Sequence, residues 1–282
     1  MTRATVTRFA PSPTGRLHLG HAYAALFAAR AAAQAGGRFL LRIEDIDGTR
    51  ARPELEDAIL ADLAWLGLAW EEPVRRQSEH MADYAAALAR LEGMGLLYPC
   101  FCTRAEIAAE IARAAAAPHG GEGQLYPGTC RRLASAERRE RLAAGRHYAL
   151  RLDVAAALAI TGPLAWHDRE RGTVRAAAEM HGDVVLARKE LGTSYHLAVT
   201  LDDNIQGVTL VTRGEDLFAA THIHRLLQAL LGLEEPDYHH HALLSDTSGR
   251  RLAKREGAPT LASLREGGAG PAEVRALVGF PD

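Results

Sequence analysis

Two short segments of this sequence carry side chains suited to binding a phosphorylated nucleotide. The first, Pro11–His21 (PSPTGRLHLGH), ends in the histidines His18 and His21. It precedes an expected helix, whose N-terminal N–H groups and dipole attract anions, and Gly15 and Gly20 let a nucleotide approach the backbone closely. We therefore expect His18, Gly20 and His21 to bind ATP, with both imidazoles acting catalytically as donors to phosphate oxygens. The alternative is that the two histidines only cap the helix.

The second segment is Arg251–Arg255 (RLAKR), which contains Lys254. Of the 33 lysine and arginine residues, only Lys189 and Lys254 are lysine. A lysine that persists in so arginine-rich a sequence suggests a role that a guanidinium cannot fill, such as a flexible point charge at a crowded phosphate. Lys254 is therefore a candidate nucleotide-binding and catalytic residue that would stabilise charge on phosphate oxygens. We assign no chemistry to Lys189.

The cysteines form a third group of chemically suitable side chains. Cys100 and Cys102 are spaced C-x-C, and Cys130 follows after 27 further residues. This pattern does not suggest a disulfide framework, whereas cysteine thiolates favour zinc. A structural zinc ion takes four ligands, and His119 is the default fourth on residue chemistry. The alternative is three reduced, buried cysteines.

Composition limits the class of protein. The chain of 282 residues is 48% hydrophobic and 24% charged, with a net charge of −2, which is typical of an ordinary soluble globular protein. No apolar run approaches the roughly 20 residues that span a bilayer, and the N-terminus lacks an apolar signal region. We expect a cytoplasmic protein with no membrane partner, and a monomer by default.

A nucleic-acid partner would need a local basic patch, because the net charge is close to neutral. One segment qualifies, with seven arginines and two glutamates: Arg131, Arg132, Glu137, Arg138, Arg139, Glu140, Arg141, Arg146 and Arg151. It is either an RNA-contacting surface or a solvated helix face.

The nucleotide-binding residues need a frame of strands and helices. The sequence predicts strands at residues 5–9 and 39–43 and helices at 20–35, 53–66 and 80–94. This alternation predicts an α/β fold with a parallel sheet, of the Rossmann-type, doubly wound kind.

The alternation breaks at Cys100, which indicates an insertion into the catalytic core. After it we expect strands near 147–152, 183–186 and 207–213, a helix at 219–231, a solvated loop that contains His239–His241, and short helices at 261–266 and 271–278. The predicted division is 1–98 for the first half of the core, 99–175 for the insertion with the zinc site and basic segment, 176–245 for the second half, and 246–282 for the nucleotide-binding loop and a short helical C-terminus.

Arg8–His21 resembles the opening of glutamyl-tRNA synthetases, which are class I aminoacyl-tRNA synthetases with a Rossmann core. The resemblance covers nearly the whole chain and continues in order at Arg42–Asp47 (RIEDID), Ser194–Asp203 (SYHLAVTLDD), Arg213–Asp216 (RGED) and the Lys254 segment. That last segment departs from the family's K-L-S-K or K-M-S-K pattern, because Arg251 and Ala253 replace its first Lys and its Ser.

The resemblance implies ATP-dependent activation of L-glutamate to glutamyl-adenylate, with Mg²⁺ accompanying the phosphates. It also implies a glutamate site, composed of Arg8, Phe9, Ala10, Pro11, Ser12, Glu44, Tyr195 and Arg213. Arg8 and Arg213 would clamp carboxylates, because guanidinium pairs with them bidentately. Glu44 would hold the ammonium group, and Tyr195 would donate to a carboxylate.

Three features resemble the shorter glutamyl-queuosine tRNA(Asp) synthetase family, which attaches glutamate to the queuosine base in the anticodon of tRNA(Asp). Residues 246–282 leave no room for an anticodon-binding domain, and Val199 stands where full-length glutamyl enzymes typically have Asn. The cysteines match that family's C-x-C … Y-x-x-x-C pattern, which implies Tyr126 as the fourth zinc ligand beside Cys100, Cys102 and Cys130, with His119 in reserve. The alternatives are a glutamyl-tRNA synthetase fragment that charges tRNA(Glu), and a non-catalytic paralogue that binds zinc and RNA.

Overall fold

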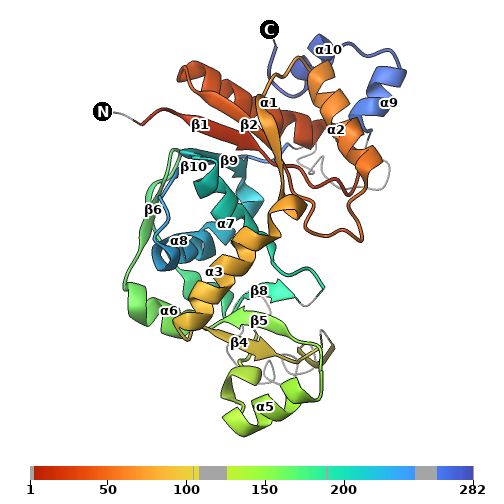
Figure 1. The fold of residues 1–282 in the computed structure, drawn as a ribbon. Coiled ribbons are helices and arrows are strands. Elements are labelled where there is room, and N and C mark those ends of the chain that lie inside the picture. Colours follow the sequence, from red (N-terminus) through yellow and green to blue (C-terminus); the bar gives the residue numbers. More distant parts are fainter. Residues whose placement is uncertain (1–2, 104, 108–125, 189, 245–258, 282) are drawn as a thin grey trace, which may run out of the picture.

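The computed structural model describes residues 3–103, 105–107, 126–188, 190–244 and 259–281. At one end of an elongated molecule lies a three-stranded parallel sheet (Figure 1). Its strands are β1 (Val6–Phe9), β2 (Arg38–Ile43) and β3 (Glu71–Arg76), in the order β1-β2-β3. The connecting helices are α1 (Leu19–Gln34) and α2 (Pro53–Trp65), each within one residue of its predicted ends.

A second sheet continues this one. It has the order β7-β6-β10-β9 and comprises β6 (Ala165–Asp168), β7 (Gly172–Arg175), β9 (Leu210–Gly214) and β10 (Asp237–His241). The two sheets meet at β1 and the start of β9, where the Thr209 N–H donates to the Val6 carbonyl at 3.0 Å. In the second sheet, β9, β10 and β6 are parallel to one another. Across the junction the parallel strands lie in the spatial order β3-β2-β1-β9-β10-β6. This is the α/β architecture with a parallel sheet that the strand–helix alternation predicts.

A smaller antiparallel sheet lies at the opposite end of the molecule, with the helix α5 (Ser135–Ala143) beyond it (Figure 1). It comprises β4 (Leu97–Cys100), β5 (Ala149–Leu152) and β8 (Val185–Arg188). Strands β6 and β7 fall within the predicted 99–175 insertion but belong to the second sheet, where β6 pairs with β10 and β7 pairs with β6. The boundaries of the predicted division remain a prediction.

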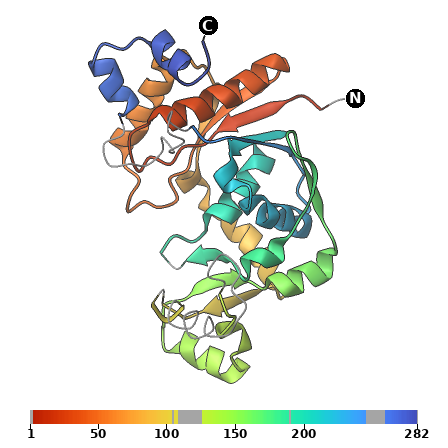
Figure 2. The same ribbon diagram turned by 180° about the vertical axis from the view of Figure 1, so that it is seen from behind.

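Helices fill the space between the sheets and around them. The helices α3 (Met81–Gly93), α6 (Val154–Thr161), α7 (Tyr195–Ile205) and α8 (Ala220–Leu231) enclose one apolar core. Leucines of α8 are fully buried there, and the helix stops at Gly232, whose φ of 61° is the left-handed conformation that glycine adopts without strain. Figure 2 shows α9 (Leu261–Glu266) and α10 (Pro271–Leu277) packed beside α1 and α2. No helix in the described ranges is long and apolar enough to cross a membrane.

One element contradicts the sequence prediction. His239–His241 was expected to be a solvated loop, but these residues form the end of β10 and pair in register with Thr212–Gly214 of β9. His240 and His241 are buried, with 4% and 6% of their surface exposed. The strand forms because the neighbouring parallel strands satisfy its backbone groups, and because the buried Asp168 of β6 pairs with the His240 ring at 2.7 Å.

Candidate active site

A cleft of about 1090 Å³ lies along the carboxyl ends of β1 and β2 and extends to the small antiparallel sheet. In doubly wound sheets this edge is where ligands bind. The predicted site residues that line it are Phe9, Ala10, Pro11, Ser12, His18, His21, Glu44 and Tyr195. Tyr126 and Arg151 line its far part, so the cleft connects the predicted nucleotide and glutamate residues with the cysteine-containing module.

His18 and His21 lie together at the start of α1, with ring centroids 3.9 Å apart. His18 is the N-cap: its Nδ1 accepts from the Gly20 N–H at 3.1 Å, and the His21 Nδ1 accepts from the His18 N–H at 3.3 Å. His18 and His21 therefore both cap the helix and line the cleft. Because each Nδ1 accepts, a neutral ring carries its proton on Nε2.

The residues on either side of the predicted phosphate-binding loop reach the same helix. Leu244 packs with the apolar side chains on α1, and Thr260 forms a β-bridge with His18. Arg251, Ala253 and Lys254 lie between Leu244 and Thr260 in the sequence, outside the described residues. Lys189 and His119 also lie outside the described residues. Both flanks of the loop therefore lie against α1, and Thr260 reaches its N-terminus.

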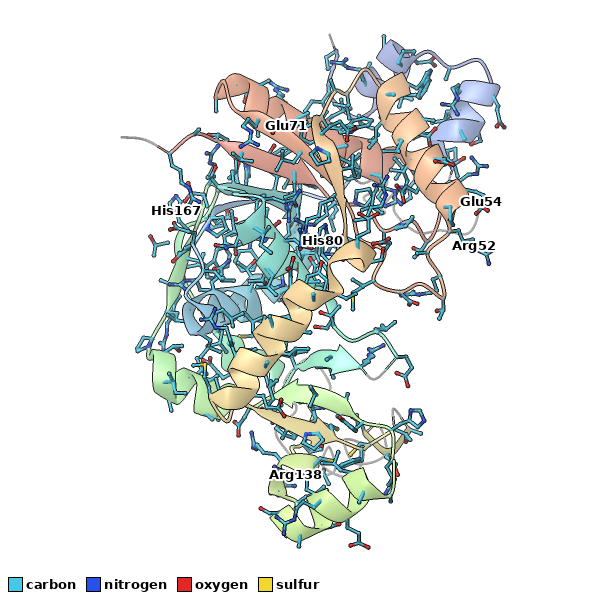
Figure 3. The ribbon with its side chains drawn as sticks, viewed as in Figure 1. Arg52, Glu54, Glu71, His80, Arg138 and His167 are labelled. Atoms are coloured by element: carbon cyan, nitrogen blue, oxygen red, sulfur yellow. The ribbon has the colours of Figure 1, made fainter. Side chains whose placement is uncertain are left out.

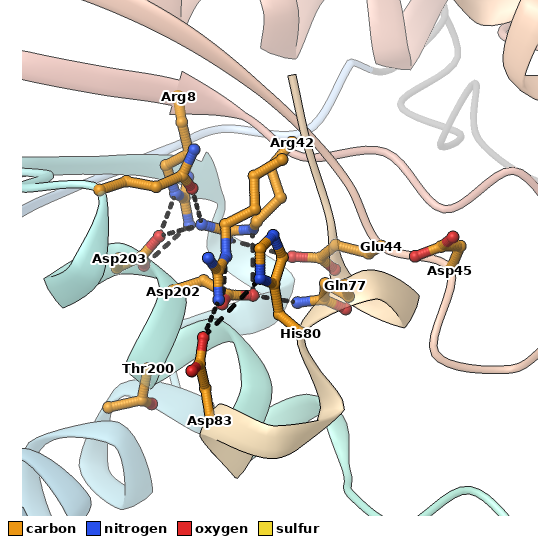
Figure 4. A network of polar contacts seen from close by, with 12 residues as sticks. Arg8, Arg42, Glu44, Asp45, Gln77, His80, Asp83, Thr200, Asp202 and Asp203 are labelled. Carbon is orange, nitrogen blue, oxygen red and sulfur yellow. Dashed lines mark hydrogen bonds and ion pairs between the residues drawn. The ribbon is translucent and has the colours of Figure 1, made fainter. Parts of the chain in front are cut away.

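A buried ion-pair network, shown in Figure 4, includes Glu44, which lines the cleft. Asp203 on α7 accepts from the Arg8 Nε and from the Arg42 Nη1, each at 2.8 Å, so a single carboxylate holds two guanidinium groups. Arg8 also donates to the carbonyl of Thr212 at 3.0 Å. Arg42 reaches the Glu44 carboxylate at 3.2 Å. Arg8, which was predicted to clamp a carboxylate, is therefore already paired with one.

Asp202, the neighbour of Asp203, holds a second part of this network and was not predicted as a site residue. Its carboxylate is fully buried and accepts from the Arg75 Nε at 2.8 Å, the Gln77 amide at 2.8 Å and the Tyr84 hydroxyl at 2.9 Å. These bonds tie α7 to β3 and α3. The consecutive acidic pair in the SYHLAVTLDD segment was the only sequence signal that could have indicated it.

Arg213, at the end of β9, is held by a different set of partners. Its guanidinium donates to the Thr221 hydroxyl at 2.6 Å, to His240 Nε2 at 3.2 Å and to His224 Nδ1 at 3.2 Å, and its Nη1 lies 3.4 Å from the Tyr195 hydroxyl. Only 6% of its surface is exposed. In the part of the chain that the structure describes, no carboxylate pairs with it. The histidines and the threonine were not predicted from the sequence.

Burial sets the ionisation of the two polar groups that line this part of the cleft. Burial raises the pKa of Glu44, against Arg42 and Arg8, which lower it. Burial also raises the pKa of Tyr195, against the nearby Arg213. The cleft therefore presents a carboxyl group beside Arg42 and a protonated phenol beside Arg213.

The three cysteines converge on one point in the small module. The sulfur atoms of Cys100, Cys102 and Cys130 all lie within 4.8 Å of one another, with Cys102 Sγ and Cys130 Sγ 3.4 Å apart. The Tyr126 hydroxyl is 3.7 Å from Cys102 Sγ and accepts from the Cys130 N–H at 2.8 Å. Hydrogen bonding from Cys100 lowers the pKa of Cys130. Ligands about 2.3 Å from a tetrahedral zinc ion lie just under 4 Å apart, so this donor set fits zinc.

The arginine-rich segment divides into paired and exposed residues. Arg131 pairs with Asp183 at 3.0 Å and Arg141 with Glu137 at 2.6 Å, whereas Arg132, Arg139 and Arg146 are exposed. The segment, which includes Arg138 on α5, lies at the opposite end of the molecule from Arg52 and Glu54 at the start of α2 (Figure 3). Arg151, the last arginine of the segment, lines the far part of the cleft.

Comparisons with known proteins agree with this arrangement. Residues 4–274 match the family of the tRNA synthetases class I (E and Q), catalytic domain. A glutamyl-Q tRNA(Asp) synthetase of Rhodobacter capsulatus is 53% identical over 98% of this chain and 100% of that protein, and one of Nocardia farcinica is 47% identical over 96% and 82%. The crystal structure of a glutamate-tRNA synthetase from Elizabethkingia anophelis superposes with a TM-score of 0.83 at 26% identity, over 99% of this chain and 61% of that one.

Proposed function

Because this chain belongs to the class I glutamyl- and glutaminyl-tRNA synthetase catalytic-domain family, we propose that it activates L-glutamate with ATP and transfers it to the queuosine base in the anticodon of tRNA(Asp). The family makes the protein a ligase. The choice of glutamate rests on the cleft, and the choice of acceptor rests on the relatives named glutamyl-Q tRNA(Asp) synthetase.

The observation that carries the glutamate assignment is the contrast between Glu44, which lines the cleft, and Arg213, which lies behind the cleft-lining Tyr195. Arg213 has only neutral partners among the described residues, and it lies beside the Tyr195 hydroxyl. Glu44 is an acidic group that lines the same cleft. A buried cation without an anion favours a ligand carboxylate, and an acidic group favours an ammonium. Glutamate carries both charges.

The nucleotide would bind at the start of α1. His18 and His21 line the cleft there, with Nε2 as the donor of each neutral ring. The flanking contacts of Leu244 and Thr260 support a place for the Lys254 loop against the same helix. Mg²⁺ would accompany the ATP phosphates and neutralise part of their charge.

The first step is displacement at the α-phosphorus of ATP. An oxygen of the glutamate α-carboxylate forms a bond to this phosphorus, and the bond to the bridging oxygen breaks, so pyrophosphate leaves with the electron pair. His18, His21 and Lys254 would stabilise the negative charge. A hydroxyl group of the queuosine then attacks the glutamyl carbonyl, AMP leaves with its electron pair, and the hydroxyl proton passes to solvent.

Two observations support a large acceptor. The cleft continues past Tyr195 to Tyr126 and Arg151, which leaves space beyond the glutamate residues. Exposed arginines near that end, among them Arg132 and Arg146, can contact RNA phosphates. The alternative acceptor is tRNA(Glu), which the structural likeness to a glutamate-tRNA synthetase favours.

The function is tested by pyrophosphate exchange followed by transfer. We expect exchange of labelled pyrophosphate into ATP that depends on glutamate and needs no RNA. Labelled glutamate should then pass to tRNA(Asp) that contains queuosine, and not to the same tRNA without queuosine or to tRNA(Glu). Exchange that requires tRNA(Glu), with transfer to its 3′ end, would establish the alternative. A complete lack of exchange under every condition would contradict both enzymatic functions and favour a non-catalytic paralogue.

We also propose that Cys100, Cys102, Cys130 and Tyr126 hold one structural zinc ion, which would fix the module that carries the basic segment. The Cys130→Ser variant is expected to lose most of its zinc, because a hydroxyl replaces a thiolate ligand. Elemental analysis of the purified protein checks this. Full zinc content in the variant, or none in the wild type, would contradict the assignment.

A matched pair of variants identifies the fourth ligand. Tyr126→Phe removes the oxygen near the cysteines, and Tyr148→Phe removes a hydroxyl from the same apolar cluster. We expect only Tyr126→Phe to release zinc more readily to a competing chelator. If His119→Ala releases it and Tyr126→Phe does not, His119 is the ligand. Cytoplasmic residence and a monomeric state remain predictions.

A further inference from the structure

Arg213 is held differently from the other buried arginines near the cleft. Arg8 and Arg42 each donate to Asp203, whose carboxylate offsets their charge. The partners of Arg213 are instead two imidazoles, a threonine hydroxyl and the more distant Tyr195 hydroxyl. The fold thus fixes this guanidinium at several nitrogen atoms without neutralising it.

The direction of these bonds follows from the chemistry of arginine. A guanidinium only donates hydrogen bonds, so His240 Nε2 and His224 Nδ1 must accept. The remaining nitrogen of each ring then carries the proton. His240 Nδ1 lies 2.7 Å from Asp168 Oδ2, and His224 Nε2 lies 3.2 Å from His196 Nδ1. Each proton therefore has an acceptor, and both rings have the tautomer that Arg213 needs.

Asp168 is itself firmly held. It lies on β6, next to β10, and is fully buried. Its Oδ1 accepts from the N–H groups of Glu170 and Arg171, and its Oδ2 accepts from the His240 N–H as well as from the ring. The aspartate therefore fixes the ring of His240 from the side opposite Arg213.

Both rings are neutral near pH 7. Burial, and then the charge of Arg213, lower the pKa of His240 to about 4, although Asp168 opposes this. Burial and Arg213 also hold the pKa of His224 well below its usual range. A neutral ring can accept from Arg213, whereas an imidazolium cannot.

We propose that His240, fixed by Asp168, and His224, fixed by His196, are positioning residues that orient Arg213 while leaving its charge for the side-chain carboxylate of the substrate. This arrangement would make the site prefer glutamate to glutamine, because the amide of glutamine offers Arg213 no negative charge. The inference rests on the proposed glutamate site. Neither histidine touches the substrate in this account; both act through Arg213.

Pyrophosphate exchange with glutamate and with glutamine as substrates tests the proposal. In Asp168→Asn the ring of His240 is free to take the other tautomer, which points an N–H at Arg213. We expect the KM for glutamate to rise by about 10- to 100-fold, because a misdirected buried hydrogen bond costs about 1–3 kcal/mol, with kcat and the KM for ATP nearly unchanged. His240→Gln, which keeps an acceptor, should lie closer to wild type than His240→Leu.

A selectivity readout separates this role from a purely structural one. In His240→Glu a carboxylate neutralises Arg213, so the preference for glutamate over glutamine should fall by at least about 100-fold, the scale of a lost charged contact. His239→Gln, on the same strand, is the matched control and should behave as wild type. Each variant's thermal unfolding and KM for ATP report whether it has folded.

The outcomes distinguish this inference from the proposed function. Wild-type protein without glutamate-dependent exchange would contradict the glutamate site itself. An active wild type whose folded Asp168→Asn and His240→Leu variants keep the same KM for glutamate, with His240→Glu retaining full preference for glutamate, would overturn the positioning role alone.

Discussion

The Arg213→Met variant is expected to lose about 10³-fold in kcat/KM for glutamate, because truncating one partner of a buried, hydrogen-bonded charge pair costs about 2–5 kcal/mol. Methionine retains most of the apolar length of the side chain, so the loss reports the charge. The KM for ATP should change little, since the nucleotide residues are on α1. Steady-state pyrophosphate exchange with glutamate and ATP varied separately measures both.

Arg225→Met is the matched control for this experiment. Arg225 lies on α8, does not line the cleft, pairs with Glu235 at 2.8 Å and donates to the Ala165 carbonyl, so its replacement removes an arginine without altering the cleft. It should leave both kinetic constants within about two-fold of wild type, as expected for a surface pair. If Arg213→Met kept the wild-type KM for glutamate, another group would have to bind the side-chain carboxylate.

The second large effect concerns stability. Asp203→Asn keeps the shape of the side chain but leaves Arg8 and Arg42 without their shared anion. Breaking a buried ion pair by removing one partner costs about 3–5 kcal/mol, so the free energy of unfolding should fall by about that amount. Urea unfolding at pH 7, followed by circular dichroism, measures it.

Asp83→Asn supplies the comparison for Asp203→Asn. Asp83 also accepts from an arginine, the partly buried Arg75, at 2.7 Å, but 42% of the Asp83 side chain is exposed and Asp202 holds the same guanidinium. Its replacement should cost less than about 1 kcal/mol. Equal destabilisation by the two variants would mean that the charge of Asp203 does not hold Arg8 and Arg42 in place.

The sequence predicted the parts of the fold that local signals determine. Helix α1 follows a glycine-containing turn, α2 begins with a proline at its first turn, and α8 ends at a glycine. Each has an apolar face or a terminal signal within its own residues. The motif residues of the cleft were predicted for a related reason: their spacing is continuous in the sequence, from Phe9 to His21.

The rest depends on contacts between distant residues. β10 contains three successive histidines, which read locally as a polar loop, and the partner that buries His240 is Asp168, 72 residues away. Helix α7 was not predicted, and its Asp202 and Asp203 are buried only because arginines from β1, β2 and β3 meet them. No local pattern encodes such pairings, so the buried ion-pair network emerged only from the tertiary structure.

The start of α1 has a consequence for how this protein can evolve. The two residues whose Nδ1 atoms cap the first turn, His18 and His21, are also residues that line the cleft. Selection for a stable helix and selection for activity therefore both act on each of these two positions. Mutational paths through this turn should be few, even where the surrounding loops vary freely.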